Sequence, residues 1–380
     1  MNYIPTISSL SPDKPSGVGK PVSTALPLSV GQVVEAIVAE KAGPSRFVLA
    51  TKDNSFLANS DLPLNKGEKL MVRVEQLSPQ IVLRAINRQE ASSLIVAEYT
   101  TTYRSNPDAL KDMFTIGKDI LNQKSLIDLL PEKTKESIRN IIKIMDASVF
   151  STATMKNPLF VKEYVSNLGL LLEYSLRKMI QEKGENGNPK SPETLKGLLM
   201  KLSEELKPQL MAENIAGKEN AQKVAQLAKF TETAIKTIES QQVINVSYKT
   251  NDASYVLQIP ILFPEGIKTG ELFIETEKEG EGGSAAKKYR VVMFLSMDAL
   301  GEMMVDASLT GNKLGCVFKF DDPEAKAFFS AFVGDLEKAV NLLGYECNSI
   351  KCMSLETLTE TKEHYHRELF SDRDAVNVFV

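Results

Sequence analysis

The stretch that decides the fold of the second half is residues 301–344, which read GEMMVDASLTGNKLGCVFKFDDPEAKAFFSAFVGDLEKAVNLLG. Apolar and polar side chains alternate over 302–309 and again over 313–320, which is typical of strands with one buried face. Thr310-Gly311-Asn312 lies between these two runs, and glycine and asparagine tolerate positive φ. The stretch therefore predicts an antiparallel hairpin.

A helix is predicted directly after this hairpin. Asp322-Pro323-Glu324 supplies an N-cap, a proline at the first helical position and an acid in the first turn. Apolar residues then recur at helical spacing until Gly344, which predicts one long helix. A short strand over 346–353 would return beside the hairpin and lie under that helix.

The strands that precede the hairpin extend this pattern into a sheet. They are expected at 255–263, 270–277 and 288–296, with a loop tip of KEGEGGSAA at 278–286. The sequence thus predicts a C-terminal α+β domain over 244–355. Its antiparallel or mixed sheet would pack on one long helix, and a polar tail would follow over 356–380.

The first half of the chain divides into three predicted parts. Residues 1–25 are rich in proline, serine and glycine and predict a flexible leader. Residues 26–90 have a period of two and hold two LPLxxG copies, at 26–31 and 62–67, which predicts a small β-barrel of SH3-like or OB-like type. Helical periodicity then indicates a helical region over 91–243.

Composition limits the classes of protein to consider. The chain has 380 residues, 43% of them hydrophobic and 25% charged, with a net charge of −4. A chain of this length predicts two or three folded domains, and its charge gives no overall attraction to nucleic acid. Its three cysteines, Cys316, Cys347 and Cys352, lack zinc-type spacing and indicate a reducing compartment.

The location follows from what the sequence lacks. Neither a signal-peptide core nor an apolar stretch of membrane-spanning length occurs, so we expect a cytoplasmic protein without membrane insertion. Export through a channel that needs no cleavable signal would leave no trace in this test.

Residues for catalysis are not visible in the sequence. The two histidines, His364 and His366, lie in EHYHRE within the predicted tail, where a solvated position is favoured over a metal site. Nothing else offers a histidine for a Ser-His-Asp or Cys-His mechanism, and no glycine-rich dinucleotide loop follows a strand. We therefore expect a non-enzymatic protein without cofactor or metal.

An alternative function rests on the N-terminal barrel. Arg84 to Arg88 matches the RxxxR half of a cyclic-dinucleotide site of the PilZ type, and Asp306 to Gly311 matches the DxSxxG half. A barrel could also bind single-stranded nucleic acid, although this one offers only Phe47 and Phe56 for stacking. The alternative is a cytoplasmic regulator whose barrel binds a cyclic dinucleotide or nucleic acid.

A family resemblance covers the C-terminal region. The quoted residues are Leu300 to Leu309 (LGEMMVDASL), Gly311 to Leu314 (GNKL), Val317 to Phe320 (VFKF), Leu342 to Tyr345 (LLGY) and Asn348 to Lys351 (NSIK). Their order resembles the C-terminal domain of the flagellar hook-length control protein family (FliK). The similarity extends over residues 234–353.

The resemblance implies a role in protein contacts. In this family the C-terminal domain contacts the cytoplasmic domain of the export-gate protein FlhB and switches the type III exporter from hook to filament subunits. The N-terminal part is exported and gauges hook length, which involves hook proteins. That part is typically unfolded in the family, whereas residues 26–243 look folded here.

Candidate residues follow from the resemblance and the strand pattern. An open strand edge, or side chains on the exposed side of the hairpin, would contact a partner, namely Glu302, Asp306, Lys313 and Lys319. Core or turn roles are expected for Leu300, Gly301, Val305, Leu309, Gly311 and Gly344.

Overall fold

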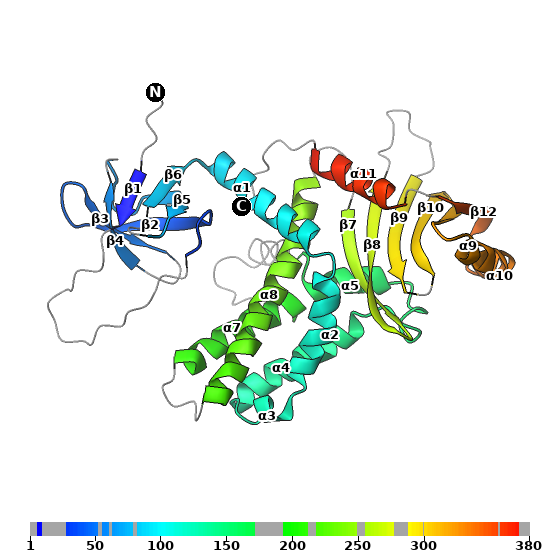
Figure 1. The fold of residues 1–380 in the computed structure, drawn as a ribbon, viewed down its shortest axis with the longest axis horizontal. Coiled ribbons are helices and arrows are strands. Elements are labelled where there is room, and N and C mark those ends of the chain that lie inside the picture. The colour runs from blue at the N-terminus through cyan, green and yellow to red at the C-terminus, as the bar shows by residue number, and fades with distance from the viewer. Residues whose placement is uncertain are drawn as a thin grey trace, which may run out of the picture. The chain divides into compact units, whose positions relative to one another are not determined.

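A computed structural model describes residues 6–9, 28–51, 55–60, 63–78, 82–171, 193–211, 218–248, 255–276, 288–298, 300–355 and 358–371. They belong to two compact units, Met1–Glu98 with Arg373–Val380, and Tyr99–Asp372 (Figure 1). Most of the predicted leader, the loop tip at 278–286 and the end of the predicted tail lie outside the described residues.

The first unit is built on a curled antiparallel sheet of five strands in the order β4-β3-β2-β5-β6. The strands are β2 (Val33–Lys41), β3 (Arg46–Ala50), β4 (Ser55–Ser60), β5 (Lys69–Gln76) and β6 (Val82–Ile86). Alternate residues point inward and form one small core, which includes Val38, Phe47, Leu49, Val72, Val74 and Leu83. The predicted period of two is confirmed here.

The leader differs in part from its prediction. Residues Thr6–Ser9 form a short strand, β1, which lies antiparallel to both β4 and β6. A flexible segment was expected because this region has little hydrophobic periodicity. Backbone pairing with two strand edges does not require such periodicity, since its hydrogen bonds come from the main chain.

The two LPLxxG copies make reciprocal contacts. The N–H of Gly31 donates to the carbonyl of Val74 on β5, and the N–H of Gly67 donates to the carbonyl of Val38 on β2, each at 2.7 Å. Both glycines have positive φ, 89° and 85°. The internal repeat seen in the sequence is therefore also a structural repeat, in which each turn is bonded to the strand that follows the other.

Replacing Gly67 with alanine isolates the backbone effect of this turn. A Cβ at this position would meet no atom within 4 Å, so only the positive φ opposes it. We expect a loss of about 1 kcal/mol in the stability of the first unit, and a smaller loss for Gly67→Asn. Urea unfolding of the full chain measures both, and an alanine variant as stable as the wild type would contradict the expectation.

Helices fill the middle of the chain, as predicted. They are α1 (Arg88–Ser105), α2 (Ala109–Leu121), α3 (Lys124–Ile127), α4 (Glu132–Ala147), α5 (Phe160–Leu168), α7 (Leu195–Met211) and α8 (Lys218–Tyr248). The apolar faces of α2, α3, α4, α5, α7 and α8 share one core with Leu257 and Ile259 of the C-terminal sheet. The predicted boundary at residue 243 therefore does not separate two cores, because the sheet buries one face against the helices.

The C-terminal sheet has six strands in the order β12-β11-β10-β9-β8-β7. They are β7 (Tyr255–Phe263), β8 (Gly266–Thr276), β9 (Lys288–Met297), β10 (Gly301–Thr310), β11 (Lys313–Phe320) and β12 (Glu346–Ser354). All neighbours are antiparallel except β11 and β12, which are parallel. Strand β8 begins earlier than the predicted residue 270. The turn at 264–265 is short, so Gly266 already pairs with Phe263 of β7.

Both faces of this sheet are covered. On one face, Leu257 and Ile259 meet the helical core, and Phe320 meets α9 (Pro323–Ser330). On the other face, Phe273 and Phe294 belong to a cluster that α11 (Leu358–Ser371) covers, as Figure 1 shows. Glu271, a charged residue on this second face, is consequently buried.

The helix predicted after the hairpin is divided in two. Helix α9 ends before Ala331 and α10 (Val333–Leu342) begins after Phe332. Asp322 caps α9 by accepting the N–H of Glu324 at 2.8 Å, as the sequence indicated. The break lets Phe329 of α9 and Val340 of α10 pack on two separate apolar clusters of the sheet, which the prediction of one long helix did not include.

The predicted polar tail contains helix α11. Leu358 at its start is buried, and Tyr365 packs against the sheet cluster. A solvated tail was predicted because few residues of α11 are apolar. The helix instead docks on the sheet, in part through the polar contacts described below. Among the described residues, no helix is long and apolar enough to cross a membrane.

Candidate functional site

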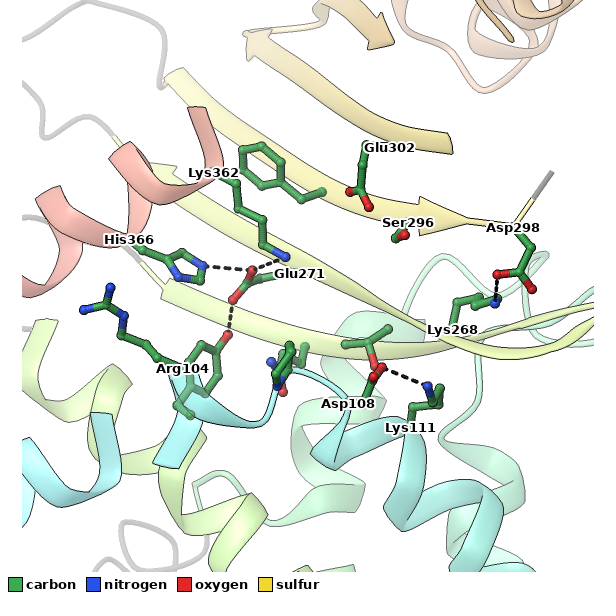
Figure 2. A pocket seen from close by; sticks show the side chains of 15 residues that line it. Arg104, Asp108, Lys111, Lys268, Glu271, Ser296, Asp298, Glu302, Lys362 and His366 are labelled. Carbon is green, nitrogen blue, oxygen red and sulfur yellow. Dashed lines mark hydrogen bonds and ion pairs between the residues drawn. The ribbon is translucent and has the colours of Figure 1, made fainter. Parts of the chain in front are cut away.

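A polar cavity of about 390 Å³ lies in the second unit, on the sheet face that α11 covers (Figure 2). Its lining side chains come from the end of α1, the start of α2, strands β7 to β10, and α11. Figure 2 shows that charged residues dominate it. This cavity is the strongest candidate for a site in the second unit.

Glu271 on β8 is the centre of the cavity. Only 4% of this residue is exposed. Its carboxylate accepts a hydrogen bond from the Tyr103 hydroxyl at 2.5 Å and contacts Lys362 Nζ at 3.2 Å and His366 Nε2 at 3.0 Å. The carboxylate therefore joins the sheet to α1 through Tyr103 and to α11 through Lys362 and His366.

The protonation state of Glu271 follows from these contacts. Burial by itself would raise the pKa of this carboxyl group. The hydrogen bond from His366, the charge of Lys362 and the hydrogen bond from Tyr103 act in the opposite direction, and together they lower the pKa to about 2. Glu271 is therefore ionised at neutral pH although it is buried.

The sequence of α11 explains why this helix presents those groups. Lys362, Tyr365 and His366 have spacings of three and four, so they share one helical face. The Tyr365 ring lies 5.4 Å from Phe273 and 5.6 Å from Phe294, and His366 lies 5.8 Å from Phe273. Helix α11 thus docks through an aromatic surface with charged groups at its edge.

A second charged cluster lies under the same helix. Arg290 of β9 donates from Nε and Nη2 to the two carboxylate oxygens of Asp306 on β10, at 2.9 and 2.8 Å. It also donates to the Tyr365 hydroxyl at 2.9 Å and lies 3.4 Å from Glu275. The hydrogen bonds to Asp306 raise the pKa of Arg290. Asp306, one of the residues predicted to contact a partner, is therefore engaged by Arg290.

Asp306→Asn tests this arrangement. The change keeps the shape of the side chain but removes the charge, and we expect a loss of about 1 kcal/mol because Arg290 is partly exposed. Lys313→Gln is the matched control, since Lys313 is exposed and lies 3.9 Å from Glu346. Thermal unfolding should separate the two variants, and equal effects would show that the Arg290 pair is not stabilising.

The remaining cavity residues are mostly paired. Lys111 contacts Asp108 at 2.9 Å, and Lys268 contacts Asp298 at 2.6 Å. Glu302 also lines the cavity, and its carboxylate has no hydrogen bond or ion pair with another described residue. These pairs neutralise one another, so the cavity does not present a strong charge of one sign.

The chemistry available to this cavity is limited. A histidine held by a carboxylate can act as a base when a nucleophile lies beside it. Figure 2 shows Ser296 well separated from His366. In the described part of the chain, no group of three or more metal-ligating side chains could hold a metal ion. The contacts of Glu271 with Lys362 and His366 connect α11 to the sheet.

The four residues predicted to meet a partner lie on one face of the hairpin but in different surroundings. Glu302 lines the cavity, Asp306 lies in the Arg290 pair, and Lys319 is half-buried on β11. Lys313 lies at the hairpin turn at the opposite end of these strands. Their contact with a partner stays a prediction.

The predicted core and turn residues occupy turns and half-buried positions. Leu300, Val305 and Leu309 are half-buried. Gly301, Gly311 and Gly344 have positive φ, and a Cβ on Gly301 would lie 2.8 Å from the carboxylate of Asp321. Glu271 was not singled out in the sequence, and a solvated position was favoured for His366, which instead contacts Glu271 at 3.0 Å. The spacing of Lys362, Tyr365 and His366 after the apolar Leu358 was the available signal.

The basic motif of the first unit is engaged within that unit. Arg84 contacts Glu75 at 3.0 Å and Glu90 at 2.6 Å, and these hydrogen bonds raise its pKa. Asp306, from the other half of the PilZ-type pattern, is paired with Arg290 in the second unit. Phe47 is buried, so its ring is not available for stacking on a base.

Known proteins offer no guide here. No family, curated protein or solved structure matches this chain.

Proposed function

We propose that this chain is a flagellar hook-length control protein of the FliK type, which acts without catalysis. Its C-terminal sheet would contact the cytoplasmic domain of an export-gate protein of the FlhB type. The observation that carries the proposal is the order of elements over 301–354, namely a hairpin, a helical segment and a parallel return strand beside β11. This order occurs within the residues that resemble the family.

The polar cavity is compatible with a contact role. The Glu271 carboxylate contacts Lys362 and His366 of α11, and the other charged residues of the cavity are mostly paired with one another. A sheet with helices packed on both faces is a suitable base for a protein-binding surface.

Deletion of the gene in its host tests the proposal. We expect overlong hooks without filaments in electron micrographs and a loss of motility, both restored by the wild-type gene. A second measurement is binding of the purified full chain to the cytoplasmic domain of the host's export-gate protein. Normal hooks together with no binding would overturn the proposal.

For the first unit we propose a small closed barrel of the SH3-like or OB-like type. The support is the pairing of β1 with both β4 and β6, which are the two edges of the five-stranded sheet. Removal of residues 1–10 should then lower the unfolding temperature of this unit. An unchanged unfolding transition would show that β1 does not close the sheet.

Location is part of the same proposal. We infer action in the cytoplasm, with export through the flagellar apparatus as the family resemblance implies. The folded strands of the first unit would have to unfold to enter a narrow channel. Immunodetection in culture medium, compared between a wild-type and an export-deficient strain, tests whether the chain leaves the cell.

A further inference from the structure

The two edges of the C-terminal sheet differ in how their backbone groups are used. Strand β7 ends the sheet on one side and β12 ends it on the other. In each edge strand, alternate residues direct their N–H and C=O groups away from the sheet. Groups that find no partner there are able to pair with a strand from another chain.

The outward groups of β7 are bonded one after another by side chains. Asn245 donates to the carbonyl of Val256 at 2.7 Å and accepts its N–H at 2.8 Å. The N–H of Gln258 donates to Gln241 Oε1 at 3.1 Å, and its carbonyl accepts the Tyr164 hydroxyl at 2.5 Å. This part of the edge cannot accept another strand.

The rest of the β7 edge is closed by the main chain. The N–H of Phe150 donates to the carbonyl of Pro260, and the N–H of Leu262 donates to the carbonyl of Phe150, both at 2.8 Å. Pro260 itself has no N–H to offer. The β7 edge is therefore sealed over most of its length.

The β12 edge is different. The N–H of Leu355 donates to the carbonyl of Phe320 at 2.8 Å, so alternation directs the backbone groups of Ile350, Cys352 and Ser354 outward. No described residue bonds to these groups, and Figure 1 shows no described strand beyond β12. The edge also contains neither a proline nor a bulge over these residues.

The helices that pack on β12 add apolar surface and negative charge. Phe328 and Phe332 are 54% and 52% exposed, and their rings lie 5.1 Å apart. Acidic residues exceed basic ones over residues 321–351, which contain both helices and the first part of β12. The carboxylates are Asp321, Asp322, Glu324, Asp335, Glu337 and Glu346, against Lys326, Lys338 and Lys351.

We propose that the β12 edge binds an extended segment of another protein as a seventh strand, in which lysine or arginine alternates with aliphatic residues. Main-chain hydrogen bonds would give affinity. Because side chains alternate between the two faces, the basic ones would point to the face on which α9 and α10 pack, toward their carboxylates, and the aliphatic ones would lie on the other face beside the exposed Met353. A second copy of this chain is disfavoured because it would bring two acidic helical segments together. The inference rests on the proposed function in that it specifies how such a protein would be held.

A peptide of nine residues in which lysine and valine alternate is the first probe. We expect the full chain to bind it in a fluorescence anisotropy titration, at least about tenfold more tightly than a matched glutamate and valine peptide. Hydrogen exchange over 346–355 should slow on binding. Failure of the lysine peptide to bind, or equal binding of both peptides, would overturn the inference.

Ser354→Pro removes one outward N–H at an exposed position and places a ring in the path of an added strand. We expect peptide binding to weaken at least about tenfold, whereas Ser354→Val should bind within about twofold of the wild type. Cys352→Pro with Cys352→Val repeats the comparison at the middle of the edge. Circular dichroism and unfolding temperature confirm that each variant is folded.

The export-gate domain separates the two proposals. If the wild-type chain binds this domain and Ser354→Pro does not, both stand. If Ser354→Pro binds the domain and the lysine peptide as well as the wild type does, the edge inference fails and the proposed function stands. If the peptide binds in an edge-dependent way but the domain does not bind at all, the edge inference stands and the proposed partner is wrong.

Discussion

Glu271→Gln is expected to destabilise the second unit by about 3 kcal/mol at neutral pH. The variant keeps the shape of the side chain but removes the negative charge that Lys362 and His366 contact. It also places an amide in a buried site arranged for an acceptor. Urea unfolding measures the loss, and faster proteolysis within α11 would show that the helix is released.

The pH dependence of this effect has a definite sign. The pKa of Glu271 is about 2 in the folded protein, below the ordinary value of 4.5. The stabilisation from this lowered pKa is therefore complete above pH 4.5 and is lost as the pH falls toward 2. The difference between the wild type and Glu271→Gln should shrink over this window.

A control for Glu271 lies on the same strand. Glu275→Gln removes a carboxylate 3.4 Å from Arg290, but its side chain is 42% exposed. We expect a loss within about 0.5 kcal/mol, because water screens the charge. Similar losses for the two variants, or a Glu271→Gln effect that is unchanged between pH 7 and pH 3, would contradict the central role of Glu271.

Phe320→Ala is the second change with a large expected effect, a loss of about 3–5 kcal/mol. Phe320 is fully buried, and its ring centre lies 4.9 Å from that of Phe329 on α9. Truncation would leave a cavity between the sheet and this helix. Thermal or urea unfolding of the full chain measures the change.

Phe328→Ala is the matched control for Phe320. It removes the same atoms from the same region, but Phe328 is 54% exposed. We expect a stability loss within about 1 kcal/mol, since most of this ring already contacts water. If both alanine variants unfold alike, α9 does not depend on the buried ring.

The sequence determined the elements whose signals are local. Polar and apolar side chains alternate over 302–309 and 313–320, which predicted strands β10 and β11. A strand places alternate side chains on opposite faces, so this pattern buries the apolar ones together. The LPLxxG copies indicated turns because their glycines adopt positive φ. The cap at Asp322 was visible because it involves only neighbouring residues.

Tertiary structure alone decided the polar cavity and the two edges of the sheet. Glu271 and His366 are 95 residues apart in the chain, so only folding brings the imidazole to the carboxylate and keeps that buried group charged. In the sequence, Glu271 is only one polar residue of the strand expected at 270–277. Likewise, β7 and β12 both look like strands in sequence. Side chains of Asn245, Gln241 and Tyr164 bond the outward backbone groups of β7. No described residue bonds the outward backbone groups of Ile350, Cys352 and Ser354 on β12. Periodicity reports which face of an element is buried, whereas the partners that cover it depend on how distant segments pack.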